Sequence, residues 1–351
     1  MSEIAIIGAG AWGTGLAIVL GRKDSHRIRL WAYEADVCQS INQNRINDKF
    51  LAGCRIPDSV TADNDLAFVL AKAEIVVSVM PSQHCRSLFE QMRTHIAPGA
   101  MIVSATKGIE EGSLQRMSEV IKHVLHSEKN TAAPLLADIA GSGDFPIGAL
   151  SGPSFAQEVA RGDPTAITIA SQDETLLRTI QQTFSDSAFR VYTNSDVVGV
   201  ELGGALKNII AIAAGICDGL GLGHNSVAAL ITRGLAEMTR LVIACGGRTE
   251  TMAGLAGLGD LVLTCTGGLS RNRSVGVELG RGKKLPEIIQ GMHGMVAEGV
   301  FTTTAAVGLA HARSVEMPIT EQMHAILHDG KSPKEAIQEL MARTGKSEIG
   351  S

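Results

Sequence analysis

Lys207 has the residue type and the surroundings of a proton-transfer group. Gly203, Gly204 and Ala211 lie at positions i−4, i−3 and i+4 from it, so on a helix they form one narrow face of small residues that would let the helix approach a cofactor closely. Partial burial there is expected to lower the lysine pKa towards neutrality. A cationic acid beside a ketone oxygen supplies the charge and the proton that reduction by hydride requires. The alternative is a lysine whose ammonium reaches solvent from a packed helix; the adjacent Asn208 favours the catalytic hypothesis.

Three further residues have the chemistry to assist such a lysine. Lys107 comes directly after an expected strand and is followed by a glycine, which suits a second cation near a carbonyl or a phosphate. An ordinary surface-loop lysine is the alternative. Asp260 and Thr264 are one helical turn apart, so both side chains can face a substrate hydroxyl or hold Lys207 in place. A helix N-terminal capping role for Asp260 is the competing interpretation.

A phosphate site is expected at residues 270–272. Arg271 and Asn272 follow a short loop, Gly267-Gly268-Leu269-Ser270, that leads into an expected helix. Backbone N–H groups at a helix start, together with a guanidinium, can bind a phosphate dianion. The substrate is therefore expected to be a small phosphorylated molecule. The alternative is that Arg271 and Arg273 are both ordinary exposed charges; the residues alone do not favour one arginine over the other.

The glycine-rich turn near the N-terminus indicates dinucleotide binding. Gly8-Ala9-Gly10-Ala11-Trp12-Gly13 follows an expected strand and opens an expected helix. In this setting Gly8 permits the tight turn, Gly10 lets the backbone approach a pyrophosphate, and Gly13 allows the helix to pack on the strand. The phosphates are then expected at the N-terminus of the helix.

Glu34 bears on which dinucleotide is used. It lies at the end of the second expected strand, where a carboxylate usually meets the adenosine ribose hydroxyls and would repel a 2′-phosphate. NAD is therefore preferred slightly over NADP. Arg22, Lys23 and Arg27 are near enough in sequence to leave dual use open, and a solvated residue at a helix start is the other interpretation of Glu34.

The alternation of apolar runs and amphipathic stretches predicts an α/β fold. We expect an N-terminal, doubly wound, Rossmann-type parallel sheet in residues 1–195, followed by an all-helical substrate and catalytic domain in residues 196–343 and a frayed tail in 344–351. Residues 126–146 are expected to form a surface loop. The expected strands are residues 3–8, 27–32, 75–80, 101–105, 147–151, 165–170 and 189–193.

Composition argues against several classes of partner. The net charge is −5 and no basic stripe is present, which disfavours nucleic acid and anionic membranes. Glycines and polar residues interrupt the most apolar run, residues 209–222, so no membrane insertion is expected. The N-terminus lacks a basic region typical of a secretory signal, and the six cysteines contain no Cys-x-x-Cys pair, which fits a reduced cytoplasmic setting. The His123/His126 and His324/His328 pairs lack a third ligand, so no metal is expected.

Six short motifs in this order give the sequence a family resemblance. They are VMPS at 79–82, SATKGI at 104–109, SGPSF at 151–155, ELGGALKN at 201–208, GLGDL at 257–261 and SRN at 270–272. From residue 4 to about residue 342 the chain resembles the bacterial-type NAD(P)-dependent glycerol-3-phosphate dehydrogenases. The resemblance implies interconversion of dihydroxyacetone phosphate and sn-glycerol 3-phosphate by a cytoplasmic homodimer that supplies the glycerol backbone of phospholipids.

The resemblance also implies roles for individual residues. Lys207 becomes the catalytic proton donor and acceptor. The implied substrate-binding residues are Lys107, Gly152, Ser154, Lys207, Asp260, Ser270, Arg271 and Asn272, and the implied dinucleotide-binding residues are Gly8, Gly10, Ala11, Trp12, Gly13, Tyr33, Lys107, Ala156, Arg271, Val296 and Glu298. Many relatives carry serine at position 11 and histidine or arginine at position 33, so Ala11 and Tyr33 leave the cofactor preference open.

Two other functions remain open at this point. A β-hydroxyacid or 6-phosphogluconate dehydrogenase also places a lysine and an asparagine on the first long helix, but Arg271-Asn272 and the Thr106-Lys107-Gly108 stretch count against it. A non-catalytic dinucleotide sensor has no need of Lys207, Lys107 and Asp260 together, so their joint presence disfavours that function. A turnover assay separates the enzyme from the sensor.

Overall fold

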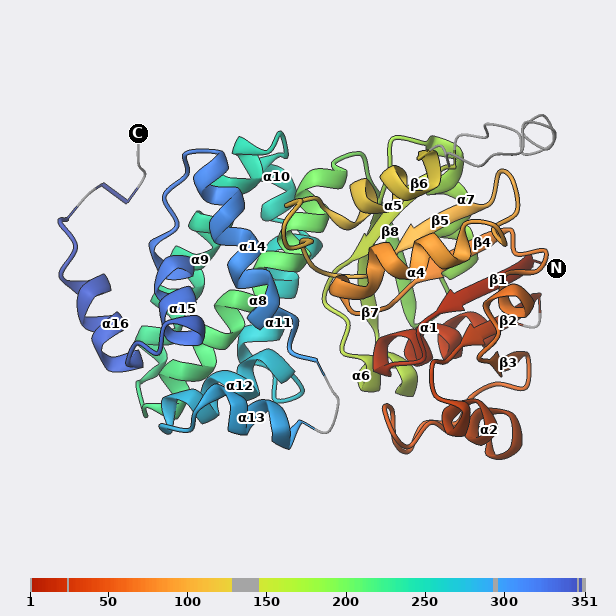
Figure 1. Ribbon diagram of the computed structural model, residues 1–351, viewed down its shortest axis with the longest axis horizontal. Helices are drawn as coiled ribbons and strands as arrows, with labels where there is room; N and C mark the ends of the chain where they lie inside the picture. The colour runs from red at the N-terminus through yellow and green to blue at the C-terminus, as the bar shows by residue number, and fades with distance from the viewer. Residues whose placement is uncertain (1, 24, 128–144, 293–295, 346, 349–351) are drawn as a thin grey trace.

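The chain folds into a sheet-bearing N-terminal part and a helical C-terminal part that lie side by side (Figure 1). The computed structural model describes residues 2–23, 25–127, 145–292, 296–345 and 347–348. Most of the loop expected at residues 126–146 therefore lies outside the described residues.

One eight-stranded sheet forms the centre of the N-terminal part, in the order β3-β2-β1-β4-β5-β6-β7-β8. The seven expected strands are present to within two residues at their ends. The strands are β1 (Ser2–Ile7), β2 (His26–Trp31), β3 (Val60–Asp63), β4 (Ile75–Ser78), β5 (Met101–Ser104), β6 (Ile147–Ser151), β7 (Thr165–Ala170) and β8 (Phe189–Asn194).

Two features of the sheet differ from the expectation. Strand β3 was not expected, because four residues with only two apolar side chains give little periodic signal. Strand β7 runs antiparallel to β6, and β8 runs parallel to β7. The helix between β6 and β7, α6 (Ala156–Arg161), packs on α1 (Ala11–Gly21) instead of crossing the sheet, so the chain re-enters the sheet from the edge at which β6 ended.

Helices cover both faces of the sheet. Along β1, Ile4 and Ile6 belong to the apolar cluster under α1 and α7 (Glu174–Phe184), whereas Ala5 and Ile7 belong to the cluster under α4 (Cys85–Met92) and α5 (Met117–His126), as expected for a strand buried on both faces. The helices of this part are α1, α2 (Ala35–Asn44), α3 (Leu66–Leu70), η1 (Ser82–His84), α4 (Cys85–Met92), α5 (Met117–His126), α6 and α7 (Glu174–Phe184).

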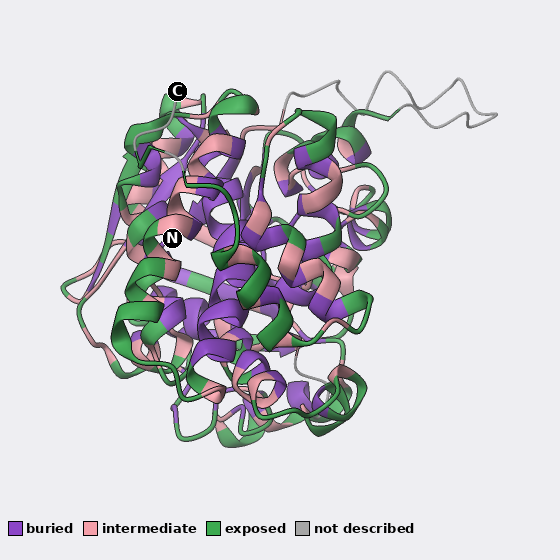
Figure 2. Cartoon of the chain, turned by 90° about the vertical axis from the view of Figure 1, so that its left-hand side faces the viewer, coloured by how far each residue is buried: buried purple, intermediate pink, exposed green. Residues whose placement is uncertain are grey.

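The C-terminal part is built around one buried helix, α8 (Val197–Gly219), in which every residue from Gly199 to Cys217 is buried. Figure 2 shows buried residues gathered at the centre of this view. The remaining elements are α9 (His224–Ala244), α10 (Thr249–Met252), η2 (Leu255–Gly259), α11 (Asp260–Thr266), α12 (Arg271–Gly280), α13 (Leu285–Gly291), α14 (Glu298–Ala312), α15 (Pro318–His328) and α16 (Pro333–Met341).

Glycines bring α8 and α12 into close contact. A Cβ added at Gly215 would lie 2.0 Å from the carbonyl oxygen of Arg273, and one added at Gly276 would lie 1.9 Å from that of Ile212. No side chain fits between the two backbones there. The α8–α12 contact therefore places residues 270–272, at the start of α12, against the helix that carries Lys207.

By length and composition alone, α8 is long and apolar enough to cross a membrane. Its most apolar 18-residue window has a mean hydropathy of 1.6, and 83% of that window is buried inside the molecule. A helix that is apolar on all sides is also what the core of a large helical assembly requires, and α8 is surrounded by α9, α11, α12 and α14.

Candidate functional site

A cluster of two lysines and one aspartate lies where α8 and α11 meet the sheet. The Nζ atom of Lys207 donates hydrogen bonds to Oδ1 of Asp260 at 2.5 Å and to Oγ1 of Thr264 at 2.7 Å. The other carboxylate oxygen of Asp260 accepts a hydrogen bond from Nζ of Lys107 at 2.7 Å. Lys207 is 6% exposed and Asp260 is 1% exposed. The structure thus brings together three residues that the sequence only suggested as a group.

The cluster poises Lys207 for proton transfer. Burial lowers the pKa of Lys207 from 10.5 to about 8; the Asp260 carboxylate opposes this shift, and the Lys107 ammonium adds to it. Near neutral pH the side chain is therefore a cation that can lose its proton at modest cost, as an acid–base group must. A lysine that reaches bulk solvent is excluded by this burial.

Asp260 does not cap its helix with its side chain. The N-cap of α11 is Gly259, no side chain caps it, and both oxygens of Asp260 point to lysines. The π-helical turn η2 directly precedes Asp260, an irregularity often found at functional sites. These contacts favour the role of holding Lys207 in place over the role of capping the helix.

The small face of α8 is used for contacts within the protein. A Cβ at Gly203 would lie 2.8 Å from the carbonyl oxygen of Ala256 in η2, and one at Gly204 would lie 2.5 Å from Oγ of Ser151 at the end of β6. These two glycines let α8 approach η2 and the sheet. The position of Lys207 beside Asp260 depends on that approach.

The loop after β6 lies beside the lysine cluster. Nζ of Lys107 also donates to the carbonyl oxygen of Gly152 at 3.3 Å, and Oγ of Ser154 donates to the same oxygen at 2.9 Å. Gly152 has a φ of 141°, and a Cβ there would lie 2.9 Å from Cα of Ile167, so this position requires glycine. The expected residues Lys107, Gly152 and Ser154 are thus together in space.

The start of α12 forms a second part of the site. Oγ of Ser270 accepts a hydrogen bond from the backbone N–H of Arg273 at 3.2 Å and caps the helix. Arg273 pairs with Asp218 at 2.6 Å, whereas exposed Arg271 has no hydrogen bond or ion pair among the described residues. The structure thereby separates two arginines that the sequence left equivalent, and Arg271 is the one available to an anion.

The side chain of Asn272 joins three helices. Its Nδ2 atom donates to Oδ1 of Asn208 at 2.9 Å, and its Oδ1 atom accepts from the backbone N–H of Gly299 at 3.0 Å. These bonds fasten the starts of α12 and α14 to the residue next to Lys207. Asn272 is buried, so its observed contacts position the site.

Glu298, at the start of α14, contacts Ser82, the first residue of η1. Its carboxylate accepts hydrogen bonds from Oγ of Ser82 at 2.7 Å and from the Ser82 backbone N–H at 3.2 Å. Burial raises the pKa of Glu298, while Ser82 and the positive charge of Arg271 oppose the shift. Ser82 was quoted within a motif but was not expected to be a site residue, because nothing in the sequence indicates a partner 216 positions away.

The glycine-rich turn has the shape expected of a pyrophosphate site. Gly8 has a φ of 120°, and a Cβ added at Gly13 would lie 1.8 Å from the carbonyl oxygen of Gly8. A Cβ at Gly10 would meet no atom within 4 Å, which leaves open space at the start of α1. No side chain caps α1, and Nε1 of Trp12 is buried without a hydrogen-bond partner among the described residues. These features fit a bound dinucleotide.

Asn47 holds this turn in place, and the sequence did not reveal it. Its Nδ2 atom donates to the carbonyl oxygen of Ala9 and to Oγ1 of Thr14, both at 2.8 Å. Asn47 also forms an isolated β-bridge with Leu51. The loop after α2 is therefore attached to the turn, although no local sequence motif predicts this contact.

At the end of β2 the cations differ from those considered in the sequence. Arg22 binds the carbonyl oxygens of Val159 and Ala160, and Lys23 binds those of Gln182 and Thr183. Arg27 pairs with Glu3 at the other end of the strands. The cation beside Glu34 is instead Lys49, at 3.3 Å. The idea that Arg22, Lys23 or Arg27 serves the Glu34 site is wrong, because β2 carries the chain away from them.

The remaining expected dinucleotide residues come from several different elements. Ala156 begins α6 and contacts Gly15 of α1, with 3.6 Å between its Cβ and a Cβ added there. Tyr33 is 81% exposed, and its ring meets that of Trp31 edge-on. Val296 is half-buried two residues before α14. Ala11 opens α1, the first helical residue after the glycine-rich turn.

Two family models cover this architecture. Residues 3–177 match the N-terminal model, and residues 196–338 the C-terminal model, of NAD-dependent glycerol-3-phosphate dehydrogenase. The chain belongs to this family. A protein of Koribacter versatilis named glycerol-3-phosphate dehydrogenase [NAD(P)+] is 64% identical over 349 residues, with 99% of each chain covered. One of the same name from Acidobacterium capsulatum is 54% identical over 351 residues, which covers 99% of this chain and 100% of the relative.

Solved structures agree with this family membership. The crystal structure of glycerol-3-phosphate dehydrogenase from Coxiella burnetii superposes with a TM-score of 0.89 at 42% identity, covering 97% of this chain and 98% of that one. The Rossmann-like sheet followed by a helical part is therefore the family's fold.

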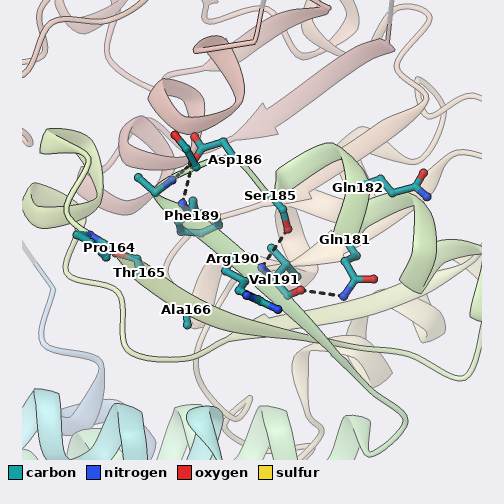
Figure 3. A pocket seen from close by; sticks show the side chains of 12 residues that line it. Pro164, Thr165, Ala166, Gln181, Gln182, Ser185, Asp186, Phe189, Arg190 and Val191 are labelled. Carbon is teal, nitrogen blue, oxygen red and sulfur yellow. Dashed lines mark hydrogen bonds between the residues drawn. The ribbon is translucent and has the colours of Figure 1, made fainter.

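Away from these family motifs, a hollow lies at the outer edge of the sheet (Figure 3). The hollow, of about 690 Å³, is lined by residues of α7, β7 and β8. Gln181 donates to the carbonyl oxygen of Val191 at 3.0 Å, and Oγ of Ser185 accepts from the Val191 N–H at 3.1 Å. These side chains bind the backbone N–H and carbonyl oxygen of Val191, so these groups of the edge strand β8 are not left unpaired.

His328, His324 and His126 have protein partners. His328 contacts Thr304 and the carbonyl oxygen of Val300, each at 3.3 Å, and His324 lies 3.5 Å from Asp329. His126 contacts the carbonyl oxygen of Lys122. Within the described part of the chain, no group of three or more His, Cys, Asp or Glu residues is placed to hold a metal ion.

Proposed function

We propose that this chain interconverts dihydroxyacetone phosphate and sn-glycerol 3-phosphate with NAD(P)H. The observation that carries the proposal is the buried Lys207, hydrogen-bonded to Asp260 and Thr264 with Lys107 on the other carboxylate oxygen. Family membership supplies the substrate, and the names of the relatives support both dinucleotides.

Lys207 carries the proton in this proposal. When bound, the reduced nicotinamide supplies the hydride that attacks the carbonyl carbon. Negative charge then grows on the carbonyl oxygen, and the Lys207 ammonium stabilises it and gives up a proton from Nζ. Asp260 and Thr264 hold the ammonium in one orientation. In the reverse direction the neutral amine takes the hydroxyl proton.

Lys107 has two roles in the proposed site. Its positive charge helps to lower the pKa of Lys207, so the proton leaves more easily. Because Lys107 is only partly buried, its ammonium is also available to an entering anionic substrate. Asp260 accepts a hydrogen bond from each lysine and so compensates their charges.

The phosphate of the substrate is assigned to the start of α12. Arg271 is exposed and has no ion pair among the described residues, and Ser270 caps the helix. Backbone N–H groups of a helix start and a guanidinium suit a phosphate dianion. Asn272 fixes this helix start to Asn208, next to Lys207, which ties the phosphate-binding end to the reacting end.

The dinucleotide is assigned to the N-terminal part. Gly8, Gly10, Ala11, Trp12 and Gly13 would hold the pyrophosphate, because the space at Gly10 is open and no side chain caps α1. The other residues proposed to contact the dinucleotide, on the side of the substrate, are Lys107, Ala156, Arg271, Val296 and Glu298. This divides the chain into a dinucleotide-binding domain, residues 1–195, and a substrate domain, residues 196–343.

Several finer features rest on family membership and on charge. NAD is preferred slightly over NADP, because Glu34 and Asp36 place two carboxylates around one lysine, Lys49. The protein works as a cytoplasmic homodimer and supplies glycerol 3-phosphate for phospholipid synthesis.

The test is a turnover assay with matched substrates. NADH and NADPH oxidation would be followed with dihydroxyacetone phosphate, unphosphorylated dihydroxyacetone and a 3-hydroxyacid precursor, for wild type and Lys207→Ala. Turnover confined to dihydroxyacetone phosphate and lost in the variant is expected. Tight dinucleotide binding without turnover on any substrate would overturn the enzymatic proposal in favour of a sensor.

A further inference from the structure

Lys49 lies beside the carboxylate that is expected to meet the adenosine ribose. Its Nζ atom is 3.3 Å from Oε1 of Glu34 and 3.9 Å from Oδ2 of Asp36. The side chains of Lys49 and Glu34 are 44% and 31% exposed, so both can be reached by a ligand. Glu34 is the N-cap of α2, at the end of β2, which is where this fold distinguishes a 2′-hydroxyl from a 2′-phosphate.

The loop that carries Lys49 is attached to the pyrophosphate turn. Asn47 donates hydrogen bonds to Ala9 and Thr14 within that turn and bridges to Leu51 on the other side of Lys49. The ammonium of Lys49 also lies 5.4 Å from the centre of the Phe50 ring. Binding of pyrophosphate at the turn would thus place the adenosine ribose within reach of a lysine whose backbone is held.

The charges around this position are unequal. Glu34 and Asp36 face Lys49, and Asp63 ends the neighbouring strand β3. Arg22, Lys23, Arg27 and Arg29, which precede Glu34 in the sequence, are bonded elsewhere. Without Lys49, carboxylates would dominate the position and oppose a phosphate dianion.

We propose that Lys49 determines cofactor specificity by allowing a 2′-phosphate to bind beside Glu34. With a 2′-hydroxyl present, Glu34 accepts its hydrogen bond while Lys49 stays paired with the carboxylate. With a 2′-phosphate present, the Lys49 ammonium turns from Glu34 to the phosphate oxygens and offsets their repulsion by Glu34. The inference rests on the proposed dinucleotide site, and it explains how a chain with an acidic residue at this position can use both cofactors.

The test compares two ligands that differ only in the 2′-phosphate. Adenosine 2′,5′-bisphosphate and adenosine 5′-monophosphate would be titrated calorimetrically into wild type, Lys49→Met and Lys49→Arg. Lys49→Met is expected to weaken the bisphosphate about tenfold, the typical effect of one charge-assisted hydrogen bond, and to change the monophosphate less than twofold. Lys49→Arg keeps the positive charge and is expected to bind the bisphosphate about as tightly as wild type does. The NADPH-to-NADH ratio of kcat/KM should decrease in parallel in Lys49→Met.

Lys334→Met is the matched control, because it removes the same charge from exposed α16, at the far end of the helical part from α2 (Figure 1). The affinity of Lys334→Met for either ligand should equal that of wild type. Equal weakening of both ligands in Lys49→Met, or no change in either, would overturn the specificity role. Failure of wild type to bind NADH and NADPH would instead overturn the dinucleotide site itself. Glu34→Gln supplies an opposite perturbation and is expected to tighten the bisphosphate severalfold.

Discussion

The pH dependence of turnover tests the lysine cluster most directly. Burial moves the Lys207 pKa from 10.5 to about 8, which corresponds to about 3 kcal/mol between the two protonation states. Reduction of the ketone needs the protonated lysine. With a pKa near 8, the protonated fraction falls from about nine-tenths at pH 7 to about one-tenth at pH 9. We therefore expect kcat/KM for dihydroxyacetone phosphate to decrease about tenfold over this range, and tenfold for each further pH unit.

The assay is NADH oxidation at saturating NADH from pH 6.5 to 10.5, with kcat/KM taken for the ketone so that the profile reports the complex before the ketone binds. Ionisation of the substrate phosphate, near pH 6, lies outside the range. Oxidation of glycerol 3-phosphate should show the opposite trend and increase up to about pH 8, because it needs the neutral amine.

Two substitutions should move the inflection in opposite directions. Lys107→Met removes a positive charge that lowers the pKa of Lys207, so the inflection should move to higher pH. Asp260→Asn removes the carboxylate that raises this pKa, so the inflection should move to lower pH. Lys334→Met, on exposed α16, should leave it in place. An inflection near pH 10 in wild type, or the same inflection in Lys107→Met and wild type, would refute the electrostatic reasoning.

Three further predictions concern stability and dinucleotide binding. Glu201→Ala should lower the free energy of unfolding in urea by about 3 kcal/mol, because it removes the buried carboxylate that pairs with Arg116 and accepts hydrogen bonds from the N–H and Oγ of Ser118; a loss under 1 kcal/mol would contradict this. Burial raises the pKa of Glu237 to about 7, so its contribution to stability is present below about pH 4.5 and is lost as pH rises to 7. Glu237→Gln should flatten that decline in urea titrations, and an unchanged slope would count against it. Gly10→Ala should weaken NADH binding at unchanged melting temperature, whereas Gly13→Ala should lower the melting temperature as well; equal melting losses would show that the space at Gly10 is not open.

Much of the fold follows from local patterns in the sequence. Strands buried on both faces appear as apolar runs, and helices that cover them repeat apolar residues every three or four positions. In α7, Leu176, Ile180 and Phe184 are buried, and the side chain of Asp173 caps the helix start. Such signals lie within one element, so the alternation of strand and helix, and its end before α8, could be predicted. β3 was missed because four residues are too few for a periodic pattern.

The direction of β7 could not be predicted in the same way. The β6–α6–β7 stretch reads locally like every other strand, helix and strand unit. Whether the helix crosses the sheet depends on where it finds a partner, and α6 packs on α1. That contact joins residues about 140 positions apart and leaves no periodic trace in either segment.

The sequence by itself determined the family, through the order of its short motifs. It also determined the glycine-rich turn and Lys207 as a candidate, because a positive φ, a close approach of a helix and a buried cation each require particular residue types within one short stretch. Only the tertiary structure decided which charges meet. Asp260 is 53 residues from Lys207 and 153 from Lys107, and Lys49, not Arg22 or Lys23, lies beside Glu34. Electrostatic interactions depend on distance in space, and many positions along a chain can bring a lysine to the same place.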